Sequence, residues 1–343
     1  MTRYLIPILL CLTTLGSARA EPIRVMTDIA PVHSLVSMVM KGIGTPDALL
    51  PPGASPHDFA LRPSDARKLS RADAVFWMGT DFTPWLGRAL EALAPDAPSL
   101  QFIDVPGTLT LPYRENAIFG AKEEHSGEED HLAHDEGGHG GHDKDGSHAS
   151  GSSAKAEKVG IAVHNHHGHA HAGGLDLHAW QNPENAKTWL DAIADTLGQI
   201  DPENITTYRA NALVAKQDID TIATELEETV RPVRGRNFVV THDAYHYFEH
   251  RFEIEALAAI LPSDGSPASA KRVQAISREL SEAVGVCIFV EPQMSDSLAR
   301  SLADQIDAKV ATLDPIGDSL QRGPELYLGL MRGIGDSLAD CLS

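Results

Sequence analysis

Short apolar runs alternate with amphipathic stretches along both halves of the chain. In the first half, strands are predicted at residues 23–27, 48–50, 74–79 and 100–105, and helices between them at 31–40, 64–71 and 84–93. In the second half the same order returns, with strands at 237–241, 255–260, 285–290 and 309–313 and helices at 244–252, 267–284, 295–306 and 324–342. Strands and helices that alternate in this way predict an α/β fold of two similar lobes, each a mostly parallel sheet with helices on both faces.

Two helices with clear start signals lie between the halves. Asn182 and Pro183 open the first, and its apolar residues fall on one stripe. Asp201 and Pro202 open the second, which continues to about Val230. Residues 203–230, at about 1.5 Å per residue, would span roughly 42 Å, which is longer than one small lobe requires. We therefore expect a long rigid helix that joins the two lobes and leaves a cleft between their sheet ends.

The first 20 residues have the pattern of a secretory signal peptide. Arg3 precedes an apolar stretch from Tyr4 to Leu15, and Ser17-Ala18-Arg19-Ala20 is typical of a cleavage site. The organisation expected is a signal at 1–20, an N-terminal lobe at 21–200, a connecting helix at 201–231 and a C-terminal lobe at 232–343. The signal predicts export. No later stretch reaches the 18 apolar residues that a membrane span needs, so we expect the mature protein to be soluble.

A segment rich in His, Gly and acidic residues, 120–172, interrupts the N-terminal lobe. It holds eleven of the 17 His of the chain. Few apolar residues offset the entropy of ordering it, so we predict a disordered loop. Imidazoles and carboxylates favour a borderline divalent metal, zinc above all. The alternatives are a solvated linker and a purification tag, and an internal, irregular run is not typical of a tag.

The charge and the cysteines limit partners and compartment. The formal net charge is −20, of which the His-rich segment supplies −6 through ten acidic residues and four Lys. This general acidity argues against nucleic acid or an anionic membrane as a partner. Only Cys287 and Cys341 follow the signal. In an exported protein two thiols favour one disulfide, and a two-Cys metal site is the weaker alternative.

Three His outside the segment share a position where a strand ends or a helix begins: His57, His178 and His242. Neutral imidazoles bind zinc at about 2.0 to 2.1 Å, and three of them leave one tetrahedral position open. Asp314, after a predicted strand, is a candidate for that position, although an Asp-Pro pair is also a common turn. His246 and His250 follow His242 at helical spacing, but we expect them on a solvated face.

Several blocks of sequence resemble the periplasmic zinc-binding proteins of high-affinity uptake transporters, the ZnuA type of metal-specific solute-binding protein. They are LLPPGASPHDFALRPSDARKL around His57, LDLHAWQNPENA around His178, FVVTHDAYHYF around His242, FVEPQ at Glu291 and TLDPIG around Asp314. Zinc members also carry a His-rich loop between the first two ligand His, and the cysteine pair resembles a family disulfide. Two departures are Pro56, where some members have an acidic residue, and His246, where a small or aromatic residue is common.

The resemblance implies zinc at the lobe interface, bound by His57, His178 and His242, and delivery of that zinc to an inner-membrane ABC permease. It implies a non-enzymatic periplasmic protein. We expect this protein to be a monomer. Besides the permease, a periplasmic zinc chaperone is a second candidate partner. The expected mechanism is capture of Zn2+, aided by the loop, followed by hand-over as permease binding shifts the lobes. The alternatives are an exported zinc buffer or chaperone, and a zinc hydrolase with Glu291 as its base.

Overall fold

The computed structural model describes residues 23–57, 59–119, 174–281 and 283–343. In the N-terminal lobe, four parallel strands lie in the order β2-β1-β3-β4. Their bounds are Val25–Thr27 for β1, Asp47–Ala48 for β2, Ala74–Trp77 for β3 and Ser99–Gln101 for β4. The helices of this lobe are α1 (Ala30–Val39), α2 (Pro63–Leu69) and α3 (Pro84–Leu93).

Alternate residues of each strand point to opposite faces of this sheet, and both faces are covered. Phe76 packs in the cluster that holds α1, whereas Val75 and Trp77 pack with Leu86 of α3 on the other face. A strand buried on both sides reads as a continuous apolar run, and AVFW of β3 is such a run. The predicted arrangement of helices on both faces is therefore confirmed for this lobe.

The C-terminal lobe repeats the plan with four parallel strands in the order β10-β9-β7-β8. Their bounds are Phe238–His242 for β7, Ala258–Leu261 for β8, Cys287–Val290 for β9 and Lys309–Thr312 for β10. Its helices are α6 (His246–Phe252), α7 (Ala270–Leu280), α8 (Ser297–Ile306) and α9 (Leu326–Leu342). Ile288 packs with α7 and α8, and Phe289 packs on the opposite face.

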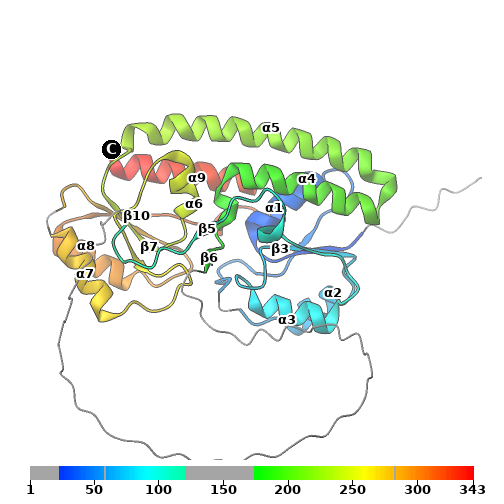
Figure 1. The fold of residues 1–343 in the computed structure, drawn as a ribbon, viewed down its shortest axis with the longest axis horizontal. Coiled ribbons are helices and arrows are strands. Elements are labelled where there is room, and N and C mark those ends of the chain that lie inside the picture. Colours follow the sequence, from blue (N-terminus) through cyan, green and yellow to red (C-terminus); the bar gives the residue numbers. More distant parts are fainter. Residues whose placement is uncertain (1–22, 58, 120–173, 282) are drawn as a thin grey trace, which may run out of the picture. The chain divides into compact units, whose positions relative to one another are not determined.

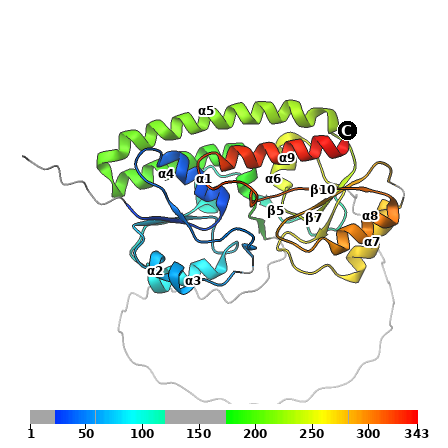
Figure 2. The ribbon, with the colours of Figure 1, turned by 180° about the vertical axis from the view of Figure 1, so that it is seen from behind.

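Helix α5 (Ile205–Val230) joins the two lobes, as predicted. It follows α4 (Pro183–Ile200) after a tight turn and lies along α1 and α4 of the first lobe and α9 of the second (Figures 1 and 2). A Cβ on Gly335 of α9 would lie 2.4 Å from Leu226 Cδ2, so a side chain there would displace the buried Leu226 side chain of α5. On the solvent side, Lys216 pairs with Asp191 of α4 at 2.6 Å.

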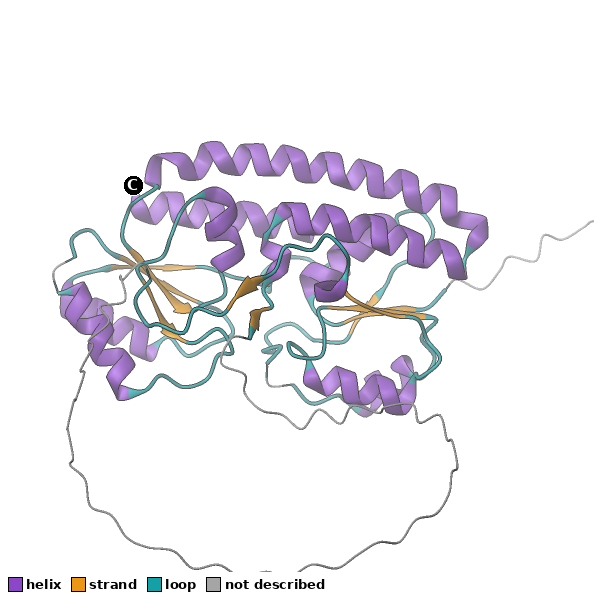
Figure 3. Cartoon of the chain, in the orientation of Figure 1, coloured by secondary structure: helices purple, strands orange, loops and turns teal. Residues whose placement is uncertain are grey.

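Two local predictions were wrong, and one pair of strands was not predicted. The strand predicted at 100–105 ends at Gln101 and is followed by a 3-10 turn, Phe102–Asp104. A small antiparallel pair, β5 (Leu111–Pro112) and β6 (Leu175–Asp176), was not predicted (Figure 3). The helix expected to start at residue 244 begins at His246. Asp243, which could have capped a helix from residue 244, instead accepts a hydrogen bond from Arg114.

The two cysteines form the expected disulfide, Cys287–Cys341, which joins the start of β9 to the end of α9. Within the described residues, no helix has the length and apolar character needed to cross a membrane. The predicted signal at 1–20 and the predicted His-rich loop at 120–172 lie outside the described residues.

Candidate metal centre

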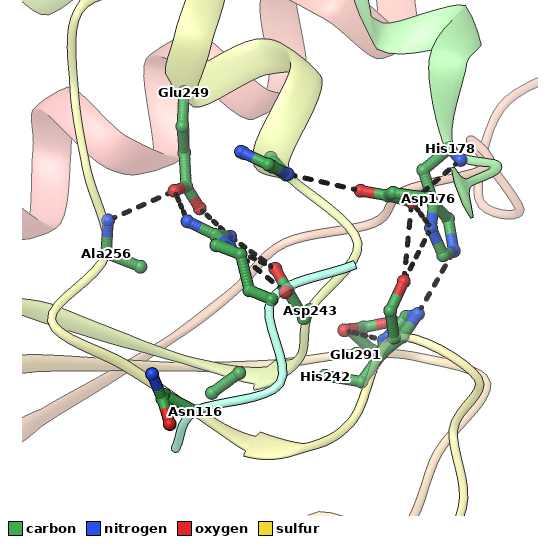
Figure 4. A network of polar contacts seen from close by, with 12 residues as sticks. Asn116, Asp176, His178, His242, Asp243, Glu249, Ala256 and Glu291 are labelled. Atoms are coloured by element: carbon green, nitrogen blue, oxygen red, sulfur yellow. Dashed lines mark hydrogen bonds and ion pairs between the residues drawn. The ribbon is translucent and has the colours of Figure 1, made fainter. Parts of the chain in front are cut away.

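His242 is the last residue of β7, the strand that lies between β8 and β9, and carboxyl ends of parallel strands meet at one edge. Glu291 follows β9, and its Oε1 accepts a hydrogen bond from His242 Nδ1–H at 2.6 Å (Figure 4). Burial alone would lower the pKa of His242, but the charge and hydrogen bond of Glu291 raise it above its usual value. Because Nδ1 carries the proton, the lone pair of His242 is on Nε2, which faces the neighbouring lobe's His178.

His178 is placed by the small β5–β6 pair. Two residues before it, Asp176 Oδ1 accepts hydrogen bonds from the His178 amide at 3.0 Å and from His178 Nδ1–H at 2.7 Å (Figure 4). Burial would raise the pKa of the Asp176 carboxyl, but the charge and hydrogen bonds of His178 lower it below its usual value. His178 therefore also presents Nε2, and the two Nε2 atoms lie 3.4 Å apart.

His57 lies in the irregular Pro- and Gly-rich loop after β2. The loop is held by the indole N–H of Trp85, which donates to the Pro56 carbonyl at 3.1 Å, and by the His57 amide, which donates to Ser55 Oγ at 3.3 Å. Burial, with repulsion from His178 and His242, lowers the pKa of His57 to about 3. The ring is therefore neutral at physiological pH, the form that binds a metal.

One nitrogen from each of these three imidazoles lies within 4.8 Å of the others, and within the described ranges this is the one such group of His, Cys or carboxylate side chains. Zinc ligands at about 2.0 to 2.1 Å in a tetrahedral site are roughly 3.4 Å apart, the separation that His178 and His242 already have. Two carboxylates behind two imidazoles form the arrangement that orients zinc-binding His and raises their basicity.

The cavity at this point has a volume of about 20 Å³ and is lined by the three His together with Phe82, Trp180, Met294 and other residues. That volume holds about one water-sized guest. The walls are mostly apolar, so an ion bound there exchanges its water ligands for imidazole nitrogens. The site suits a single small cation.

Asp314 lies two residues after β10, but it is not part of this group. Its Oδ1 accepts hydrogen bonds from the amides of Ile316 at 3.2 Å and Gly317 at 2.9 Å, and from Gln293 Nε2 at 3.0 Å. The structure thus brings together three of the four predicted site residues. The fourth has its carboxylate turned into its own Asp-Pro turn.

Sequence reasoning did not assign roles to Asp176 and Glu291 as partners of the site His, and it placed His246 incorrectly. His250 is exposed as expected, but the side chain of His246 is only 19% exposed and faces Asp176. Asp176 stands two residues before His178, and Glu291 stands at a strand end like His242. These positions in the sequence could have identified the two carboxylates as hydrogen-bond partners of the site His.

A family model described as "Zinc-uptake complex component A periplasmic" matches residues 25–341. The chain belongs to the ZnuA family. Among ZnuA relatives, the high-affinity zinc uptake system protein ZnuA of Paracoccus denitrificans is 39% identical, with 95% of this chain and 93% of that protein covered. The protein of the same name from Brucella suis is 35% identical, with 96% and 94% covered.

Solved ZnuA-type structures have the same fold. One entitled "Crystal structure of ZnuA" superposes with a TM-score of 0.70 at 19% identity and covers 94% of this chain and 100% of that one. The periplasmic zinc-binding protein TroA of Treponema pallidum gives a TM-score of 0.68 at 16% identity, covering 94% and 100%. The two-lobed α/β architecture with its joining helix is thus the ZnuA and TroA fold.

Proposed function

We propose that this ZnuA-family chain captures Zn2+ in the periplasm through His57, His178 and His242. The observation that carries the proposal is the convergence of three imidazoles. The Nε2 atoms of His178 and His242 lie 3.4 Å apart, and each of these two rings is hydrogen-bonded to a carboxylate. Zinc prefers imidazole nitrogen, and the two carboxylates, Asp176 and Glu291, balance the charge of a dication.

The fourth coordination position belongs to a water molecule or to Asp314 in this proposal. Asp314 would have to leave its bonds to the amides of Ile316 and Gly317 to reach an ion. Each such bond contributes about 1 kcal/mol or more because the acceptor is charged, so water has the smaller cost.

Delivery follows from the family, whose relatives are named as parts of a high-affinity zinc uptake system. We propose export by residues 1–20 and hand-over of zinc to an ABC permease. His57 and His178 belong to the first lobe and His242 to the second, so any partner that favours a different lobe arrangement weakens the site. A single chain supplies all three ligands, which supports a monomer as the working unit.

A hydrolase is disfavoured by the geometry. The cavity of about 20 Å³ leaves no space for a substrate beside the ion. Glu291, the one base suggested by the sequence, holds His242 Nδ1–H at 2.6 Å. Glu291 is therefore engaged as the partner of a ligand imidazole, which favours zinc binding over general-base chemistry.

The test is a competitive zinc titration of the intact mature chain and of His57→Ala, His178→Ala and His242→Ala, with exposed His250→Ala as the control. Each of the three should lose tight binding by 100-fold or more, roughly what loss of one of three protein ligands implies, whereas the control should keep it. Retained tight binding in His57→Ala would place the main site elsewhere. Unchanged zinc affinity in the presence of the permease would contradict hand-over and leave a zinc buffer.

A further inference from the structure

The two oxygens of the Asp176 carboxylate have different surroundings. Oδ1 accepts hydrogen bonds from the backbone and the ring of His178 and lies 3.3 Å from Ser263 Oγ. Oδ2 is equally buried, and in the described part of the chain it has no hydrogen-bond partner. Buried carboxylate oxygens are normally satisfied, so a donor belongs at this point.

The group that faces Oδ2 is the imidazole of His246. Its Nδ1 lies 3.8 Å from Asp176 Oδ2 and, among the described residues, is likewise buried without a hydrogen-bond partner. The separation exceeds a hydrogen bond of about 2.7 to 3.2 Å by less than 1 Å, which a small rotation of the ring can close. The residue also borders a cavity of about 340 Å³ that is lined by Arg114 and His250 among others.

A second metal ion is the other occupant that an imidazole nitrogen and a carboxylate oxygen could share. No third ligand of that kind joins them, because among the described residues His57, His178 and His242 are the one group of three. An ion there would share the Asp176 carboxylate with the main site, and two dications so close repel strongly. A hydrogen bond between the two unpartnered atoms satisfies both at no such cost.

We propose that His246 is a positioning residue for the zinc site, with Nδ1–H donating to Asp176 Oδ2. The inference rests on the proposed function, since it concerns the geometry of His178 as a ligand. His246 fixes the Asp176 carboxylate from one side, and the carboxylate fixes the His178 ring on the other with Nε2 toward the ion. Loss of the link leaves the fold intact but lets His178 tilt, which weakens zinc binding and speeds release.

The test uses His246→Phe, which keeps a ring without nitrogen, and His246→Asn, whose amide nitrogen can take the place of Nδ1. His250→Phe, one turn later on α6 and exposed, is the matched control. Zinc affinity is measured on the full mature chain by chelator competition with Trp180 fluorescence as the signal, because the Trp180 ring lies 5.2 Å from that of His178. The visible absorption of the Co2+ form reports ligand geometry directly.

We expect His246→Phe to bind zinc about 10-fold more weakly and to shift the Co2+ spectrum, His246→Asn to recover most of both, and His250→Phe to match the wild type. In an Asp176→Asn background, His246→Phe should have no further effect, because the link is already lost. A purely structural role would instead lower the metal-free unfolding temperature and leave the Co2+ spectrum unchanged.

Three results would overturn the inference: wild-type affinity and spectrum in His246→Phe, equal weakening in His250→Phe, or loss of one tightly bound ion per chain in His246→Phe. Failure of the proposed function has a different signature. In that case His178→Ala itself keeps tight zinc binding, whatever the His246 variants do.

Discussion

Two imidazoles at the site are held from behind by buried carboxylates. Glu291 and Asp176 each fix one ring by a short hydrogen bond to Nδ1–H, which leaves Nε2 free in both. Partners of this kind determine the tautomer and basicity of a zinc ligand. The two carboxylates also place negative charge behind the imidazoles, which favours a cation in the cavity.

The substitution Asp176→Asn should therefore weaken zinc binding about 10- to 100-fold while the chain still folds. The amide keeps the shape of the carboxylate and can accept one hydrogen bond, but it removes the negative charge. Chelator competition measures the effect, and Asp218→Asn on the exposed face of α5 is the control for loss of charge alone. Equal affinity in the two variants would show that the Asp176 carboxylate makes no specific contribution to zinc binding.

Asp28 is a further buried carboxyl group, and it is not part of the metal site. It accepts hydrogen bonds from the amides of Ile29 at 2.7 Å and Met78 at 2.9 Å, and burial raises its pKa to about 7. The folded state thus holds a proton that the unfolded chain releases above about pH 4. The stabilisation is complete below that pH and is lost as the pH rises through about 7.

Wild-type protein and Asp28→Asn should consequently differ in a pH-dependent way. From pH 4 to 7 the free energy of unfolding of metal-free wild type should fall relative to the variant by up to about 1.4 kcal/mol per pH unit. Urea unfolding at pH 4.5, 6 and 7.5 measures it. The variant leaves one amide without a full acceptor, which adds a constant offset, so a difference that does not change with pH would contradict the assignment.

At the scale of elements, most helices and strands were predictable because each buries a face with a regular period. The stripe on α5 is an example. Strand β7 is buried along its whole length and is recognised instead by its short continuous apolar run. Strands β5 and β6, with two residues each, carry no period, and they form because distant segments meet. Asp243 illustrates the same limit. Its carboxylate pairs with Arg114, which is distant in the sequence, and the residues around Asp243 do not indicate this contact.

The positions of the site His were predictable for a physical reason, and their partners were not. Strand ends of a parallel sheet converge at one edge, which places His242 and Glu291 together. The orientation of a side chain depends on tertiary packing, as His246 shows: helical spacing suggested solvent, whereas the fold turns its Nδ1 inward.

The contact between α5 and α9 is a further test at this scale. A side chain at Gly335 would overlap Leu226, so Gly335→Val should lower the free energy of unfolding by about 2 kcal/mol. Gly333, on the same helix, has open space around its Cβ position, and Gly333→Ala should raise stability by about 0.5 to 1 kcal/mol. Denaturant titration measures the free energy of unfolding of both variants. If Gly335→Val were as stable as Gly333→Ala, α5 and α9 would accommodate a side chain at residue 335 without cost.

At the scale of the whole molecule, the Cys287–Cys341 bond closes a loop with a sequence separation of 54. Replacement of both residues by Ala should lower the free energy of unfolding by about 4 kcal/mol, the value for a loop of this length in the chain-entropy model. Zinc affinity should not change, because Cys287 begins β9 and Glu291 follows its other end. A large loss of affinity in the double variant would link the disulfide to the site.

The small volume of the metal cavity bears on which ions the molecule can accept from its surroundings. A fully hydrated dication carries about six waters, whereas the cavity holds about one water-sized guest. An ion must therefore enter stripped of nearly all its water. Magnesium sheds its hydration shell reluctantly and gains little from imidazole in exchange, whereas zinc gains strong nitrogen bonds. The tight walls thus act as a dehydration filter, and abundant hard cations are kept out by the water they will not give up.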